Sequence, residues 1–251
     1  MSYHTWTAEE LESSIVYLNG TCWRFVESQY VCSTMKIVDN KSEQHRLEEL
    51  LEETKPPIPE ACSDLNYLLF TPFRYKPPHN GSRFRREGQT EGAFYASEKI
   101  ETALAEISFY RLLFYTESPD TPLPLNPCPF QVFPIKYASD RSIDLTIPPL
   151  NTDQKYWEIP NDNSYCQEIA DHARANNINV IRSSSVRCPE EGKNITILSC
   201  DAFAEKAPKA SKFESWRLII KKDRAIAVKE CRSSNALSFT KESFSNDPRM
   251  K

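Results

Sequence analysis

A stretch rich in glycine and arginine, residues 81–115, is where the sequence most clearly suggests chemistry. Three of the chain's five glycines (Gly81, Gly88 and Gly92) lie in the first twelve residues of this stretch. Because glycine adopts backbone conformations that other residues resist, this spacing predicts a tight turn or a close approach of the backbone. Residues 71–86 contain no Asp or Glu, in a chain of net charge −4. This reversal of sign predicts an anion site, most commonly for phosphate. Its cations are Arg74, Lys76, Arg83, Arg85 and Arg86.

A strand and a helix follow the loop and would position its side chains. Residues 93–96 are apolar and aromatic, which predicts a strand. Ser97 suits the N-cap of the next helix, with Glu98 and Glu101 in the first turn, where carboxylates favour the helix dipole. The sequence therefore predicts a turn from strand to helix near residue 97.

The helix that follows carries a carboxylate beside its apolar face. Apolar residues recur at helical spacing from Ile100 to Ile107, and Glu106 lies at the edge of this stripe. Arg111 falls within the stripe, so either the register is imperfect or the helix ends early. A glutamate in this position is commonly a solvated flank, and its local pattern alone assigns it no role.

Composition narrows the class of protein. A chain of 251 residues predicts one domain with extensions. No apolar run reaches the roughly 20 residues needed to span a bilayer, and the N-terminus lacks the pattern of a secretory signal, so we expect a cytoplasmic protein without membrane contact. The acidic charge argues against direct nucleic-acid binding. Eight cysteines without a C-x-x-C pair predict reduced thiols and no metal site. P-loop and dinucleotide-binding glycine motifs are absent.

The N-terminal third predicts a short helix, a strand and a second helix. Residues 7–10 match a capping box, which predicts a helix to about Leu18 that Gly20 then ends. Residues 21–26 alternate as a strand does, and from this pattern alone Arg24 would be a surface charge on an edge strand. A helix over 42–54 would turn its three leucines inward, namely Leu47, Leu50 and Leu51. Residues 65–70 fit either a helix or a strand.

The second half alternates in the same way. Five prolines between 117 and 130 predict a loop, and Pro134 favours an edge or a bulge in the strand that follows. The remaining expected elements are a helix at 165–176, strands at 178–181 and 192–198, and peripheral strands at 216–220 and 225–228, before a polar tail that frays.

Several of these motifs together resemble the RES domain, a family of NAD-consuming toxins. In the first half the matching pieces are P-F-R-Y (72–75), G-S-R-F (81–84), F-Y-A (94–96) and T-A-L-A-E (102–106). In the second half, a helix and a strand lead to S-V-R (185–187), G-x-N (192–194) and another strand. The resemblance covers residues 20–205 as the RES domain, with 1–19 as a helical extension and 206–251 as peripheral strands and tail.

The resemblance implies both a fold and a set of site residues. The fold would be α+β, an ADP-ribosyltransferase-like split mixed β-sheet with flanking helices. The catalytic residues would be Arg83, Tyr95, Glu106 and Ser185, with Ser184 replacing Ser185 if the register slips by one. The substrate-binding residues would be Arg24, Phe84 and Arg187.

The implied activity is cleavage of the nicotinamide–ribose bond of NAD+ by phosphorolysis or hydrolysis. NAD+ would be the substrate and inorganic phosphate a possible co-substrate, with no resident cofactor. The protein would be the toxin of a toxin–antitoxin pair, with a helix-turn-helix antitoxin as partner. Two alternatives stay open: a protein ADP-ribosyltransferase on the same fold, and an inactive module that binds NAD or phosphate. The sequence leaves the oligomeric state open.

Overall fold

Helices and strands alternate irregularly along the chain, and the strands join one mixed sheet, which confirms the predicted α+β class. The computed structural model describes residues 5–28, 37–77, 79–230 and 236–250. The helices in this part are α1 (Ala8–Ser13), α2 (Lys41–Glu53), α3 (Tyr67–Arg74), α4 (Ile100–Glu117), α5 (Gln154–Trp157) and α6 (Ser164–Ala175). The strands are β1 (Val16–Glu27), β2 (Phe94–Ser97), β3 (Cys128–Asp144), β4 (Val180–Ser184), β5 (Lys193–Ile197), β6 (Glu214–Ile220), β7 (Arg224–Lys229) and β8 (Ala236–Thr240).

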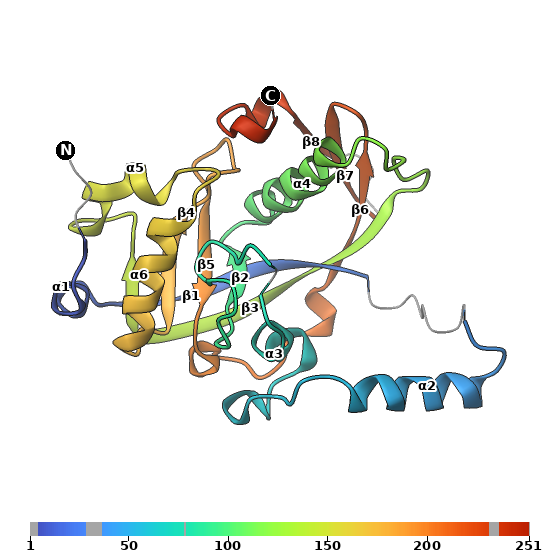
Figure 1. Ribbon diagram of the computed structural model, residues 1–251, viewed down its shortest axis with the longest axis horizontal. Coiled ribbons are helices and arrows are strands. Elements are labelled where there is room, and N and C mark those ends of the chain that lie inside the picture. The colour runs from blue at the N-terminus through green and yellow to red at the C-terminus, as the bar shows by residue number, and fades with distance from the viewer. Residues whose placement is uncertain (1–4, 29–36, 78, 231–235, 251) are drawn as a thin grey trace.

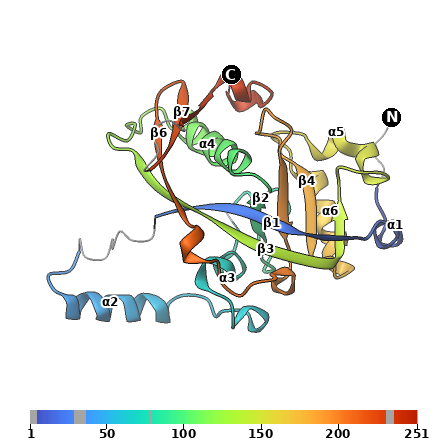
Figure 2. The same ribbon diagram turned by 180° about the vertical axis from the view of Figure 1, so that it is seen from behind.

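Part of the sheet closes into a ring of strands. The strand order is β1-β2-β5-β4-β3, and β1 also pairs with β3. The long strands β1 and β3 run antiparallel side by side, from Val16 opposite Ser142 to Glu27 opposite Phe130 (Figures 1 and 2). The C-terminal end of β3 pairs with β4 in parallel, whereas its N-terminal end pairs with β6. The sheet is therefore split, with the ring at one end of β3 and β6, β7 and β8 at the other.

Pro134 lies between these two halves. On one side it is opposite Trp23 of β1, while β6 pairs only with residues 128–132 and β4 only with residues 142–144. Proline has no N–H to donate, so it suits a position where one side of the strand has no ladder partner. The predicted edge position of Pro134 is confirmed.

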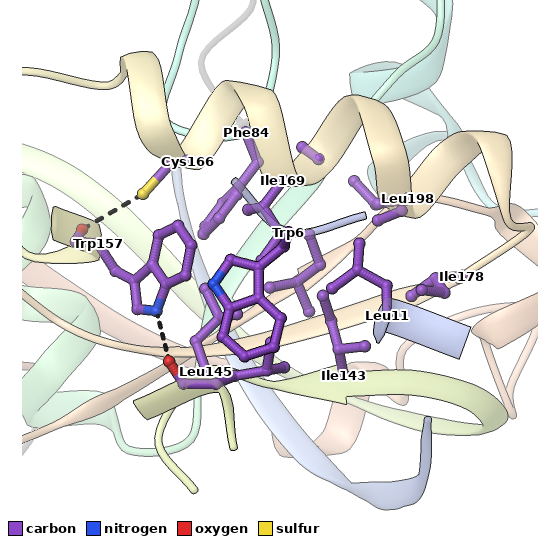
Figure 3. Packing of buried hydrophobic residues seen from close by; sticks show 14 of the residues in the cluster. Trp6, Leu11, Phe84, Ile143, Leu145, Trp157, Cys166, Ile169, Ile178 and Leu198 are labelled. Atoms are coloured by element: carbon purple, nitrogen blue, oxygen red, sulfur yellow. Dashed lines mark hydrogen bonds between the residues drawn. The ribbon is translucent and has the colours of Figure 1, made fainter. Parts of the chain in front are cut away.

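Buried side chains pack into three clusters around the sheet. One lies beneath α1 and α6, where Ile169, Ala170 and Ala173 are buried as predicted. Figure 3 shows this cluster, with Trp6, Trp157 and Leu145 packed between the helix and the strands. A second cluster joins α4 to β6 and β7, and a third joins α3 to β2 and β3. The segment 65–70, which fitted two structures, lies mainly in α3.

The N-terminal helix is shorter than predicted. Its capping box is present, since Thr7 and Glu10 bond to each other's backbone N–H groups, but the helix ends at Ser13 instead of near Leu18. Gly20 lies within β1 and does not end a helix. Residues 16–27 pair along their whole length with β3, and these tertiary hydrogen bonds outweigh the local helical preference.

Helix α2 corrects the predicted inward leucines. It forms where expected, but Leu50 and Leu51 are 43% and 44% exposed, and none of its residues is buried. Figure 1 shows α2 set apart from the rest of the molecule. An ion pair from Arg74 to Glu52, at 2.6 Å, joins the end of α2 to α3. The helical period was correct, but the sequence does not state whether an apolar stripe has a neighbour to cover it.

The sequence predicted a C-terminal tail that frays, but the last described residues are packed against the fold. β6 and β7 match the expected peripheral strands and β8 is additional. Beyond β8, Phe244, Asp247 and Met250 are buried, and Phe244 packs edge-on against Phe109 of α4. We call residues 244–250 the C-terminal turn. Its burial means that the end of the described chain is part of the folded body.

Two of the cysteines form a disulfide, Cys62–Cys200, contrary to the expectation of reduced thiols. The bond joins segments 138 residues apart in the chain. Cys22, Cys128, Cys166 and Cys188 are free, and Cys32 and Cys231 lie outside the described residues.

None of the helices in the described ranges is both long and apolar enough to cross a membrane.

Candidate functional site

A pocket of about 540 Å³ is lined by six of the seven predicted site residues, all but Ser185. Arg83, Tyr95 and Glu106 line it, from the arginine loop (residues 79–92), β2 and α4 respectively. The three predicted substrate-binding residues, Arg24, Phe84 and Arg187, line it as well. A volume of this size lies in the range of small-molecule sites.

The carboxylate of Glu106 is held through one oxygen. Its Oε1 accepts hydrogen bonds from Ser185 Oγ at 2.7 Å and from Asn194 Nδ2 at 2.6 Å. Ser97 Oγ donates to Asn194 Oδ1 at 2.7 Å, which fixes the orientation of that amide. Within the described ranges Oε2 accepts no hydrogen bond, so it is available to a ligand in the pocket.

The sequence predicted Ser97 as the N-cap of α4, and this prediction is wrong. Ser97 lies in β2, and the N-cap of α4 is Lys99, whose side chain makes no capping bond. The Ser97 hydroxyl instead donates its hydrogen bond to the side chain of Asn194. The strand thus continues one residue further than expected, and Arg111 interrupts the pattern without ending the helix, which runs to Glu117.

Ser185 lies behind Glu106 and does not line the pocket. It is buried, and its Oγ accepts bonds from the backbone N–H groups of Arg187 at 3.2 Å and Cys188 at 3.0 Å while donating to Glu106. Ser184, the alternative, instead accepts a bond from Lys193 at its hydroxyl and one from Arg83 at its carbonyl. The structure places Ser185, and not Ser184, against the glutamate.

The arginine loop is anchored by the residue after Arg83. Phe84 is almost fully buried in the cluster beneath α6, and Figure 3 shows its ring beside Ile169. Gly81 adopts a φ of +65°, where an added Cβ would meet Arg85 O at 2.6 Å, so the turn requires glycine as predicted. The loop is therefore fixed in place, and Arg83 extends from it.

Arg83 is oriented by two carbonyl groups. Its Nη1 donates to Ser184 O at 2.9 Å and its Nη2 to Trp157 O at 2.6 Å. The same Trp157 carbonyl accepts a bond from the Cys166 thiol, drawn in Figure 3. Among the described residues Arg83 forms no ion pair, so its charge stays available to an anion.

Tyr95 presents its ring to the pocket with its hydroxyl fixed at the far end. The hydroxyl lies 2.8 Å from Ser82 Oγ and accepts a bond from Phe84 N at 3.1 Å. Burial raises the pKa of Tyr95 above its ordinary value, so the phenol is neutral at physiological pH. The ring cannot swing away without breaking these bonds to the arginine loop.

Arg24 belongs to the pocket and is not an edge-strand charge. β1 pairs with β2 on one side and with β3 on the other, so it is an interior strand at this point. Arg24 Nη1 donates to Tyr95 O at 2.7 Å, and its guanidinium lies over the Phe94 ring at 4.6 Å. Burial lowers the pKa of Arg24 to about 10, which leaves it charged at pH 7.

Arg187 is held by the C-terminal turn. It donates to Asp247 Oδ2 at 2.7 Å and lies 3.7 Å from the centre of the Phe109 ring. Asp247 also pairs with Arg249, which lines the pocket. The charged side chains around the pocket are thus four arginines and Glu106, with Asp247 behind two of the arginines, so the lining is electropositive as the sequence predicted.

Sequence reasoning missed three residues of the site. Asn194 lay in the quoted G-x-N motif, but its role as a donor to Glu106 was not assigned. Asp247 and Arg249 lie 60 residues and more beyond Arg187, in a segment with no motif. Asn194 could have been found, because it is a polar residue within a matched motif. No local sequence pattern indicated Asp247 or Arg249.

Comparison with known proteins identifies a protein family and a similar solved structure. No curated protein matches the chain. A chain in the crystal structure of the M. tuberculosis MbcT–MbcA toxin–antitoxin complex is 12% identical, with a TM-score of 0.46, over 84% of this chain and 91% of that chain. The family model of the RES domain matches residues 58–220, well over half of the 251 residues. The chain therefore belongs to the RES domain family.

Proposed function

We propose that this protein cleaves the nicotinamide–ribose bond of NAD+, by phosphorolysis or hydrolysis. The observation that carries the proposal is the Glu106 carboxylate, fixed through Oε1 by Ser185 and Asn194 inside a pocket lined by arginines. Membership of the RES domain family supports NAD+ as the substrate class, and the pocket contains a carboxylate placed to act on it.

The chemistry needs a carboxylate more than it needs an acid. When the bond between C1′ of the ribose and the ring nitrogen breaks, its electron pair goes to nitrogen and nicotinamide leaves neutral without protonation. The ribose develops oxocarbenium character, as in glycoside cleavage. Glu106 Oε2 would stabilise that positive charge, and a preorganised carboxylate does so without reorganisation during the reaction.

The acceptor then bonds to C1′. A phosphate oxygen would give nicotinamide and ADP-ribose 1″-phosphate, and water would give nicotinamide, ADP-ribose and a proton. Arg83 and Arg24 suit the pyrophosphate, or an incoming phosphate in the case of Arg83, because guanidinium groups bind phosphate oxygens in pairs. The Tyr95 ring would stack on nicotinamide. Ser185 donates a hydrogen bond to Glu106, which fits a positioning role and not an acylating one.

Incubation with NAD+, with and without phosphate, tests the proposal. Release of free nicotinamide with ADP-ribose or its phosphate is the expected result. ADP-ribose bound covalently to protein would replace the proposal with protein ADP-ribosyltransfer, and binding without turnover would leave a binding module. A role as a toxin, and a helix-turn-helix antitoxin that blocks the pocket, are further proposals that co-expression with candidate antitoxins would test.

A further inference from the structure

Two buried hydroxyl groups beside the pocket have no hydrogen-bond partner among the described residues. They belong to Ser183 of β4 and Thr196 of β5. Both residues line the pocket, although they are only 1% and 0% exposed. Buried hydroxyls are normally hydrogen-bonded, because leaving one unpaired costs free energy. Unpaired groups at a ligand pocket are therefore candidates for ligand contacts.

The strand register places these hydroxyls next to the reacting end of the site. Tyr95 lies opposite Thr196, and Asn194 lies opposite both Ser97 and Ser183. Residues directly opposite each other, and residues two apart in one strand, share a face of the sheet. Thr196 is thus the neighbour of Tyr95, and Ser183 is the neighbour of the amide that holds Glu106. We call this face of β2, β4 and β5 the pocket floor.

We propose, resting on the proposed function, that Ser183 and Thr196 bind the carboxamide group of nicotinamide. A carboxamide offers one acceptor oxygen and two N–H donors, and each hydroxyl can both donate and accept. The ring that carries this group would stack on Tyr95, whose cross-strand neighbour is Thr196. The two hydroxyls would hold the ring against the floor, with its glycosidic nitrogen towards Glu106.

Inhibition by small pyridines tests this proposal directly. Nicotinamide carries the carboxamide, and 3-methylpyridine has a methyl group in its place. For Ser183→Ala and Thr196→Val, we expect the inhibition constant of nicotinamide in NAD+ cleavage to rise about 3- to 10-fold, as the loss of one hydrogen bond implies. The inhibition constant of 3-methylpyridine and the Kd of ADP-ribose should stay within about twofold of wild type.

Two control variants separate recognition from folding. Thr196→Ser keeps the hydroxyl and should keep nicotinamide inhibition near the wild-type value. Ser108→Ala removes another fully buried, unpartnered hydroxyl, on α4 and away from the pocket lining, and should change neither constant. A variant of the floor that fails to fold would be recognised by its circular dichroism, and its partner variant would then provide the test.

The outcomes are distinct. An unchanged inhibition constant of nicotinamide in folded Ser183→Ala and Thr196→Val would overturn the proposal. Weaker binding of ADP-ribose alone would also overturn it, because the hydroxyls would then contact the ADP-ribose part of NAD+. If the wild type cleaves no NAD+, the proposed function fails, and calorimetric titration with nicotinamide alone still decides whether the floor binds the carboxamide.

Discussion

Ser185 Oγ donates a hydrogen bond to Glu106 Oε1 at 2.7 Å, although 79 residues separate the two in the sequence. Glu106 comes from the second turn of α4, and Ser185 directly follows β4. Two backbone N–H groups donate to the Ser185 hydroxyl and orient it. The main chain therefore fixes the Glu106 carboxylate indirectly, through Ser185. Such an arrangement holds a charge in place before a substrate arrives, which is the condition for electrostatic stabilisation of a transition state.

Replacing Glu106 with Gln should lower NAD+ turnover by about 100-fold or more while the fold persists. The amide keeps the shape of the side chain and removes its charge. Chromatographic measurement of released nicotinamide gives the rate, and circular dichroism confirms folding. Near-normal turnover in the folded variant would show that Glu106 does not carry the chemistry.

Asn194→Ala should lower kcat by about tenfold with little change in KM. The amide orients Glu106 through a 2.6 Å hydrogen bond, and the loss of one such bond to a charged group is worth about 1.5–3 kcal/mol. Steady-state kinetics with NAD+ separate the two constants. A change in KM alone would mean that Asn194 contacts the substrate and does not position the carboxylate.

Arg83→Lys should weaken the use of NAD+ or phosphate by about 1–3 kcal/mol, seen mainly as a higher KM. Lysine keeps the charge but cannot donate to Ser184 O and Trp157 O in the fork that holds Arg83. Arg86→Lys is the matched control, because Arg86 lies in the same loop but is exposed and paired with Asp171. Equal effects of Arg83→Lys and Arg86→Lys would mean that Arg83 contributes only its positive charge and makes no specific contact with the ligand.

Asp247→Asn should destabilise the fold by about 3 kcal/mol or more at pH 7. Asp247 is fully buried and Arg187 is 4% exposed, so the change leaves a buried guanidinium without its counter-ion. Urea unfolding followed by circular dichroism measures the loss. A free energy of unfolding equal to that of the wild type would show that the ion pair contributes nothing to stability.

The same pair predicts a dependence of stability on pH. Burial by itself would raise the pKa of Asp247, but hydrogen bonds from Arg249 and the charge of Arg187 lower it below its ordinary value. A lowered folded-state pKa stabilises the fold above the unfolded value of about 3.9, and this stabilisation is lost as pH falls through the folded-state pKa. The gap between wild type and Asp247→Asn should therefore narrow below about pH 4. A gap that stays constant down to pH 2 would contradict this assignment.

Much of the fold could be predicted because it depends on local patterns. The helical period of α6 and the apolar strands β2, β4 and β5 gave elements within a few residues of their observed bounds. The predictions failed where a tertiary partner decided the outcome. Residues 16–18 form strand because β3 pairs with them. Leu50 and Leu51 of α2 are exposed because the described structure places no other element over them.

The site followed a similar division. Order and motif brought Arg83, Tyr95, Glu106 and Ser185 to attention, and the structure places three of them at the pocket and the fourth behind Glu106. Their catalytic roles stay predictions. Asp247 could not be found, because its function depends on a buried arginine that is distant in sequence. No local pattern records such a pairing.

The ring of strands sets the smallest fragment that can keep the site intact. The family match begins at residue 58, yet β1 (Val16–Glu27) closes the ring and contributes Trp23, Arg24 and Phe25 to the pocket. A fragment of residues 58–220 would lose this strand together with Arg249, and would expose the edges of β2 and β3 to other chains. Transplanting the matched segment into another protein should therefore give an aggregating, inactive product, whereas transplanting residues 5–250 carries both the ring and its pocket.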